Sequence, residues 1–233
     1  QYNMGFYRGP NIVTDGLIFA IDAGSTRSYP GSGTTVNSLI GSHVGTLNNG
    51  VGFSSSNGGT FVYDGIDDDI TVPYSTELDP TAGITFDAWI YPTDLTTIAN
   101  QEIYRKENAS ARHLFSFQSN GTILSFGTQT TGNSYNELDI SITASDFVNK
   151  WNHVVASYQS GSKVIYVNGQ SIGSTTSITG TLVQAVAVQV IGSSQSSSEF
   201  FKGNYASFKM YNRGISAAEV LQNYNAQKSR YGL

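Results

Sequence analysis

The chain has 233 residues, a formal net charge of −5 at pH 7 and no cysteine. Without cysteine it cannot form disulfides, thiolate-ligated zinc sites or cysteine nucleophiles. Its 12 basic residues are scattered, which argues against nucleic acid as a partner, and it has no run of about 18 apolar residues that would indicate insertion into a membrane.

Residues 1–11 precede the first strand-like segment, and we predict that they form an N-terminal arm. The arm carries side chains of the types that are enriched in interface cores, namely Tyr2, Phe6, Tyr7 and Arg8. We therefore expect it to anchor the domain to a neighbouring subunit. The alternative is that its rings fold back over their own domain.

Alternation of apolar and polar residues with period two predicts strands along most of the remaining chain. The clearest segments are residues 17–21, 60–63, 69–72, 84–91, 114–117, 123–126 and 164–167. Asn120-Gly121 and Asn168-Gly169 follow two of these segments, and an Asn-Gly pair in this position is the strongest short signal for a β-hairpin. The sequence therefore predicts an all-β, antiparallel architecture.

The segment 84–91 predicts which side chains fill the core. Its alternation places Phe86, Ala88 and Ile90 on one face and Trp89 on the other. We expect the first three between two sheets and Trp89 covered by a loop or by a C-terminal helix.

That helix is predicted by a capping box at Ser216 and Glu219, in which each side chain bonds the other residue's backbone amide. We expect it to cover about residues 216–228. No Gly/Ser-rich segment is long enough to be an interdomain linker. Residues 12–233 are therefore predicted to form a single domain.

Patterns that indicate catalysis are missing from the sequence. Sandwich glucanases place three acids on one strand as E-x-D-x-E, and the nearest approach, E-L-D at residues 137–139, lacks the third acid. Glu102 and Glu107 are five residues apart, so a continuous strand would turn them to opposite faces. His153 begins a predicted strand and is expected to be packed and hydrogen-bonded. We predict no catalytic residues and a protein that is not an enzyme.

Two weaker candidates for binding remain. Asp67 and Asp68 lie in an acidic turn, where we expect their side chains to accept hydrogen bonds from backbone amides. We therefore predict no cofactor. The alternative is that the two aspartates bind a calcium ion, which takes six to eight oxygen ligands. Tyr135 lies in a polar loop and is the candidate for stacking on a sugar, with ordinary packing as the alternative.

Four segments carry a family pattern. Residues 63–68 read Y-D-G-I-D-D, residues 86–92 read F-D-A-W-I-Y-P, residues 151–169 begin W-N-H-V-V and end Y-V-N-G, and residues 211–219 read Y-N-R-G-I-S-A-A-E. Over residues 15–228 the chain resembles the LamG-like domains of the concanavalin A-like lectin/glucanase superfamily. The resemblance implies a jelly-roll sandwich of two antiparallel sheets. In this family an aromatic residue usually follows the acidic turn, whereas Asp69 occupies that position in this chain.

The two ends of the chain resemble one particular group within this superfamily. Residues 12–17, 22–24, 28–35 and 225–233 resemble LamG-like virion proteins of tailed bacteriophages. This implies a non-enzymatic protein of the virion surface, such as a decoration, fibre or appendage subunit. Its partners would be other virion subunits or further copies of itself, together with host-surface glycans. The alternatives are a free, extracellular lectin-type module that binds carbohydrate, and a glycan hydrolase.

Overall fold

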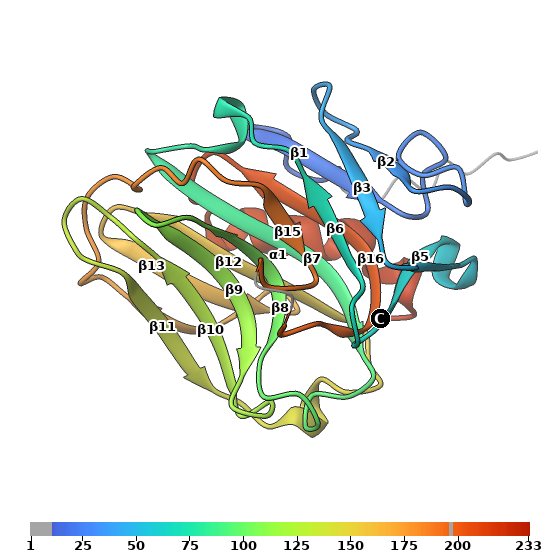
Figure 1. The fold of residues 1–233 in the computed structure, drawn as a ribbon. Coiled ribbons are helices and arrows are strands. Elements are labelled where there is room, and N and C mark those ends of the chain that lie inside the picture. The colour runs from blue at the N-terminus through green and yellow to red at the C-terminus, as the bar shows by residue number, and fades with distance from the viewer. Residues whose placement is uncertain (1–10, 196–197) are drawn as a thin grey trace, which may run out of the picture.

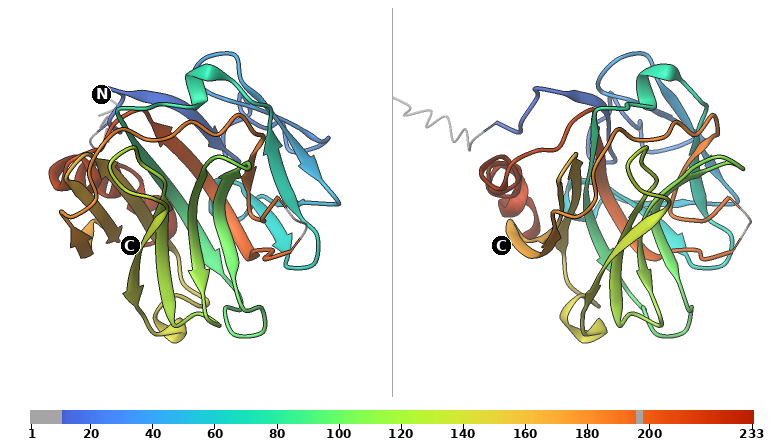
Figure 2. Two further views of the ribbon diagram at one scale, coloured as in Figure 1. Left: turned by 60° about the vertical axis from the view of Figure 1, so that its left-hand side comes forward. Right: turned by 90° about the vertical axis from the view of Figure 1, so that its left-hand side faces the viewer.

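The computed structural model describes residues 11–195 and 198–233. Within them two antiparallel sheets pack face to face, as Figure 1 shows. One short helix near the C-terminus lies against the outer side of the first sheet (Figure 2). This is the all-β sandwich that the sequence predicts. The residues proposed for anchoring, Tyr2, Phe6, Tyr7 and Arg8, lie outside the described residues, and the division into an arm and a single domain stays a prediction.

The first sheet has the strand order β14-β13-β12-β7-β16-β5-β4, and β1 also pairs with β16. Its strands are β1 (Leu17–Asp22), β4 (Gly52–Ser54), β5 (Thr60–Asp64), β7 (Gly83–Pro92), β12 (Asn152–Gln159), β13 (Ser162–Val167), β14 (Gln170–Thr175) and β16 (Lys202–Tyr211).

The second sheet has the order β11-β10-β9-β8-β15-β6-β3-β2. Its strands are β2 (Thr35–Asn37), β3 (Val44–Asn48), β6 (Asp69–Val72), β8 (Gln101–Glu107), β9 (Arg112–Gln118), β10 (Ile123–Thr128), β11 (Asn136–Ser141) and β15 (Gln189–Ile191). The helix α1 (Ala217–Gln227) is followed by a short 3-10 turn, η4 (Lys228–Tyr231). Among the described residues, no helix has the length and apolar character needed to cross a membrane.

Both predicted hairpins are confirmed. Asn168 and Gly169 have φ of 51° and 79° and join β13 to β14 in a two-residue loop, which requires positive φ at both positions. Asn120 and Gly121 have φ of 54° and 74° in the loop between β9 and β10. The glycines relieve the steric strain that a side chain would meet in this backbone conformation.

The predicted faces of β7 are also confirmed. Phe86, Ala88 and Ile90 are fully buried in the main core between the sheets, where the ring centroid of Phe86 lies 4.1 Å from that of Tyr104. Trp89 points to the other side of the first sheet. There the ring of Tyr231, from η4, stacks on it at 4.1 Å. The C-terminal segment thus covers a second, smaller apolar cluster.

A buried polar cluster lies beneath α1. The carboxylate of Asp87 is 2.9 Å from the ammonium of Lys209 and 3.1 Å from Nε2 of His153, and it accepts a hydrogen bond from Nδ2 of Asn223 at 2.8 Å. His153 is therefore packed inside the protein, as the sequence predicts. Burial raises the pKa of the Asp87 carboxyl, but Lys209 and His153 outweigh it and hold that pKa below its ordinary value.

The predicted capping box between Ser216 and Glu219 is formed at the start of α1.

Candidate functional site

The outer surface of the second sheet is mostly polar where it crosses β9, β10 and β11. Core side chains such as Phe115, Phe117 and Phe126 point inward from these strands, so their neighbours in sequence point outward. The outward residues used below are Arg112, Ser116, Gln118, Ser125, Gly127, Glu137 and Asp139. Among them Ser116, Ser125 and Gly127 are buried, and Arg112, Gln118, Glu137 and Asp139 are at least partly exposed. We call this surface, together with Tyr135 at its edge, the polar face.

Tyr135 lies across the polar face. Its hydroxyl sits above Gly127 of β10, where a Cβ atom would collide with it. The hydroxyl donates a hydrogen bond of 2.5 Å to Oε1 of Glu137, and the guanidinium of Arg112 lies 5.2 Å from the ring centroid. Burial, and then Glu137, raise the pKa of Tyr135, so the phenol stays neutral. The structure thus places a half-buried, oriented aromatic ring where the sequence predicts a loop candidate.

Further hydrogen bonds connect the strands of the polar face. Nε2 of Gln118 donates to Oε2 of Glu137 at 3.4 Å. The hydroxyl of Ser125 donates to Oδ1 of Asp139 at 2.6 Å. Hydrogen-bonding groups beside an aromatic ring are chemically suited to sugar hydroxyls and to the apolar face of a sugar ring.

Beside the polar face, Arg105 of β8 holds three carboxylates. Its guanidinium lies 2.6 Å from Glu102, 2.9 Å from Glu107 and 3.3 Å from Glu199. Glu107 also pairs with Arg112 at 2.6 Å, which connects this cluster to the polar face. Burial raises the pKa of Glu102 well above its ordinary value although Arg105 opposes this effect. Glu102 is only 1% exposed.

The prediction that Glu102 and Glu107 face opposite sides is wrong. The pairing of β8 with β9 shifts register between Glu102 and Tyr104, and such a bulge adds one residue to the strand. The added residue reverses the alternation, so both glutamates reach Arg105. Nothing in the sequence marks this shift. The approach of Glu199 from a distant segment is likewise invisible in a local pattern.

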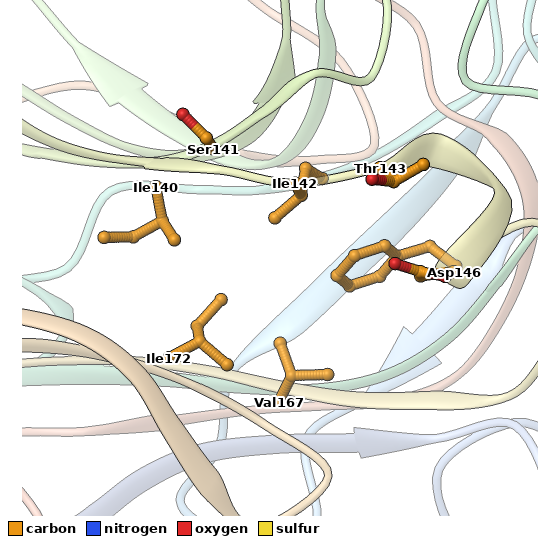
Figure 3. Close-up of a pocket in the computed structure, with 8 residues that line it drawn as sticks. Ile140, Ser141, Ile142, Thr143, Asp146, Val167 and Ile172 are labelled. Atoms are coloured by element: carbon orange, nitrogen blue, oxygen red, sulfur yellow. The ribbon is translucent and has the colours of Figure 1, made fainter.

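A hollow of about 440 Å³ opens where the edge strands β11 and β14 meet (Figure 3). Ile140 and Ile142 face Val167 and Ile172 across it. Ser141, Thr143, Asp146 and Phe147 complete the lining. This mainly apolar lining offers fewer hydrogen-bonding side chains to sugar hydroxyls than the polar face does.

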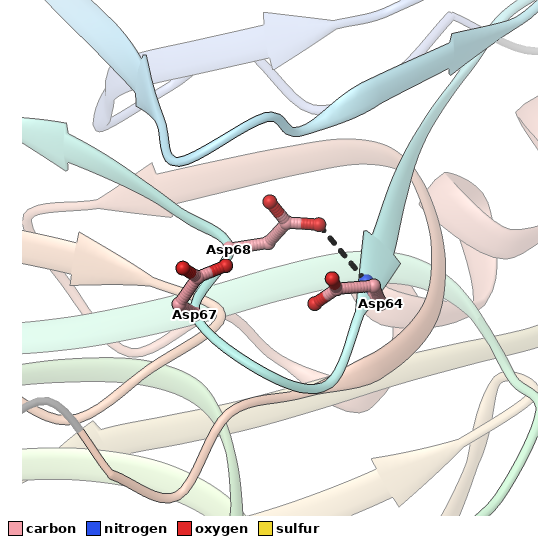
Figure 4. Close-up of side chains that lie close together, drawn as sticks. All are labelled: Asp64, Asp67 and Asp68. Atoms are coloured by element: carbon pink, nitrogen blue, oxygen red, sulfur yellow. Dashed lines mark hydrogen bonds between the residues drawn. The ribbon is translucent and has the colours of Figure 1, made fainter.

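The acidic turn between β5 and β6 contains the other sequence candidates. Oδ2 of Asp68 accepts the backbone amide of Asp64 at 2.9 Å (Figure 4), which is the role that the sequence predicts for it. None of the described residues donates a hydrogen bond to the carboxylate of Asp67; its backbone carbonyl accepts one from Asn49 at 2.7 Å. The expected role of Asp67 in fixing the turn through its side chain is therefore not seen.

Comparison with known proteins assigns the family. Residues 64–221 match the laminin G family model that is described as the concanavalin A-like lectin/glucanases superfamily. The chain belongs to this superfamily. The match includes the segments around the acidic turn, Trp89, Trp151 and the capping box that carry the resemblance in the sequence. No curated protein matches this superfamily member.

Solved structures with the same fold include toxin binding domains. The binding domain of botulinum neurotoxin serotype G matches with a TM-score of 0.71 and 14% sequence identity. The match covers 91% of the chain described here and 51% of the toxin chain. The receptor binding domain of botulinum neurotoxin D gives 0.71 and 15%, over 91% and 53%. A structure of botulinum neurotoxin type C, which depends on interaction with two ganglioside molecules to enter cells, gives 0.69 and 13%, over 91% and 51%. The chain thus spans about half the length of these proteins, and the likeness shows the fold.

Proposed function

We propose that the chain is a non-enzymatic module that binds glycans through its polar face. The observation that carries the proposal is the ring of Tyr135, which lies across the sheet above Gly127 beside the hydrogen-bonding side chains of Gln118, Glu137 and Asp139. The lectin-like superfamily and the ganglioside dependence of botulinum neurotoxin type C agree with it.

The carboxylates near the polar face support a binding role and not hydrolysis. A glycosidase needs two carboxyl groups about 5–10 Å apart that both reach the substrate, one of them protonated. The raised pKa of Glu102 suits a general acid, but its carboxyl group is buried against Arg105 and cannot reach a sugar. Glu137 is hydrogen-bonded to Tyr135, and Asp139 to Ser125. Release of reducing ends from polysaccharide above a control without protein would contradict this part of the proposal.

A glycan array with the whole chain tests the binding site. Tyr135→Ala should lower the affinity for the bound glycan about tenfold, which corresponds to 1.4 kcal/mol. Tyr74→Ala is the matched control, because Tyr74 is another half-buried tyrosine with a cation, Lys106, 5.2 Å from its ring centroid. Its affinity should equal that of the wild type. An array without any bound glycan, or equal binding by Tyr135→Ala, would refute the proposal.

We further propose that this module acts at the virion surface of a tailed bacteriophage. The resemblance of the two chain ends to LamG-like virion proteins supports this location. Mass spectrometry of purified particles should find the chain at a fixed copy number. Absence of the chain from particles that infect normally would contradict the virion location and favour the alternative, a free extracellular lectin.

The arm residues Tyr2, Phe6, Tyr7 and Arg8 are proposed to anchor the domain to other virion subunits or to further copies of itself. Deletion of residues 1–10 should leave a folded protein, because the described core lies within residues 11–233. That variant should no longer join the particle. Normal incorporation of the deletion variant would contradict the anchoring role.

A further inference from the structure

A lysine of the first sheet reaches across the core to the hairpin that carries Tyr135. Lys163 of β13 is fully buried, and its Nζ donates a hydrogen bond to the backbone carbonyl of Asn136 at 2.7 Å. The same ammonium lies 4.9 Å from the ring centroid of Phe126. Phe126 belongs to β10 and Asn136 to β11, so Lys163 contacts both strands of the hairpin whose loop ends at Tyr135.

Unlike two other buried lysines, Lys163 has no carboxylate partner. Lys106 pairs with Asp79 at 2.7 Å, and Lys209 pairs with Asp87 at 2.9 Å. Lys163 forms no ion pair with any residue of 11–195 or 198–233. Because a buried ammonium without an ion pair is unfavourable for folding, stability does not explain a lysine at this position.

The carbonyl that Lys163 holds belongs to the residue between two groups of the polar face. Asn136 joins Tyr135 to Glu137, and the phenol of Tyr135 donates its hydrogen bond to the carboxylate of Glu137. In the register of the hairpin, Glu137 lies opposite Gly127, above which the phenol sits. A shift of Asn136 would therefore move both the ring and the carboxylate.

The tip of the same loop is fixed by other contacts. The amide of Thr131 donates to the carbonyl of Thr181 at 2.8 Å, and the amide of Thr179 donates to Oδ1 of Asn133 at 2.9 Å. These bonds attach the tip of the loop to residues 179–181. Lys163 acts at the base of the loop, next to Tyr135.

Burial makes Lys163 sensitive to pH near neutrality. The titratable groups around Lys163 and its neighbour His113 are Glu137, Asp139, Tyr158, Lys106 and Asp79. Burial lowers the pKa of Lys163 to about 7, although Glu137 and Asp139 oppose this effect. Burial also lowers the pKa of His113 to about 4 and raises that of Tyr158, so neither titrates near pH 7.

We propose that Lys163 is a positioning residue of the glycan site, whose ammonium holds the Asn136 carbonyl and thereby keeps Tyr135 and Glu137 in place. The inference rests on the proposed glycan function and adds a regulation of that site by pH. A protonated amine is a stronger hydrogen-bond donor than a neutral one. The affinity for glycan should therefore fall as the pH rises from about 6 to about 8.5 and Lys163 loses its proton.

Lys163→Met tests the proposal in the whole chain, because it removes the ammonium and keeps a side chain of similar length. The affinity for the glycan bound by the wild type should fall about tenfold and lose its dependence on pH. The melting temperature should stay equal or rise, since replacing a buried, unpaired charge by an apolar side chain is neutral or stabilising. Backbone amides of residues 130–136 should exchange with deuterium faster than in the wild type.

Lys150→Met is the matched control. The ammonium of Lys150 also donates to a backbone carbonyl, that of Ser145 at 3.0 Å, but Lys150 is exposed. Its affinity and amide exchange should equal those of the wild type. Equal affinity of Lys163→Met and the wild type, a parallel fall of its affinity and melting temperature, or an unchanged pH dependence would overturn the positioning role alone. A wild type that binds no glycan would refute the glycan function and this inference with it.

Discussion

Replacing the lysine beneath the C-terminal helix should strongly destabilise the domain. Lys209→Met removes an ammonium that lies 2.9 Å from Oδ1 of Asp87 and 2.9 Å from Oε1 of Gln227, and it keeps a side chain of similar length. Loss of one partner from a buried ion pair costs about 3–5 kcal/mol, because the other charge remains buried. His153 and Asn223 still contact Asp87, so we expect the lower end of this range.

Lys202→Met is the matched control on the same strand. The ammonium of Lys202 lies 3.7 Å from Asp94, and its side chain is 41% exposed. Exposed pairs of this kind contribute about 0–1 kcal/mol. The two variants therefore remove the same group from one strand and differ in burial.

Equilibrium unfolding in urea at pH 7 measures both variants. With a slope of about 1–3 kcal/mol/M, the midpoint of Lys209→Met should fall by about 1–3 M. Adding Asp87→Asn to Lys209→Met should recover part of the loss, since no uncompensated charge then remains. A loss below about 1 kcal/mol, or one equal to that of Lys202→Met, would refute the argument that burial makes this pair costly to break.

Three further predictions concern other parts of the fold. Burial lowers the pKa of His113 from 6.5 to about 4, so between these pH values the unfolded chain binds a proton that the folded chain does not. The free energy of unfolding should therefore fall as the pH drops from 6.5 to about 4. In His113→Gln the urea midpoint should depend less on pH over this range. Gly127→Ala should displace the hydroxyl of Tyr135 and weaken binding on the glycan array as much as Tyr135→Ala does. Ser216→Ala removes the cap of α1 and should cost about 1 kcal/mol, seen as a fall of about 2–4 °C in the melting temperature.

Features that depend on neighbours in the chain could be predicted from the sequence. Positive φ at Asn168 and Gly169 is a local requirement of the hairpin, and the cap at Ser216 needs only the residue three positions later. The faces of β7 followed from alternation alone, which correctly separated Phe86 from Trp89.

Features that depend on the exact register of paired strands, or on segments far apart in the chain, could not be predicted. The bulge that turns Glu102 and Glu107 to one side arises from the register of β8 against β9, and no residue type marks it. Glu199 joins them from 97 positions beyond Glu102. The position of Tyr135 over Gly127 likewise requires the paired strands β10 and β11.

The location of the buried cluster beneath α1 has a consequence for the order of folding. Its members Asp87, His153 and Lys209 come from β7, β12 and β16, and these strands must pair before the cluster exists. The helix therefore has no docking surface until the first sheet is assembled, and we expect its contacts to form after the rate-limiting step. Weakening them should speed unfolding while the folding rate stays nearly unchanged.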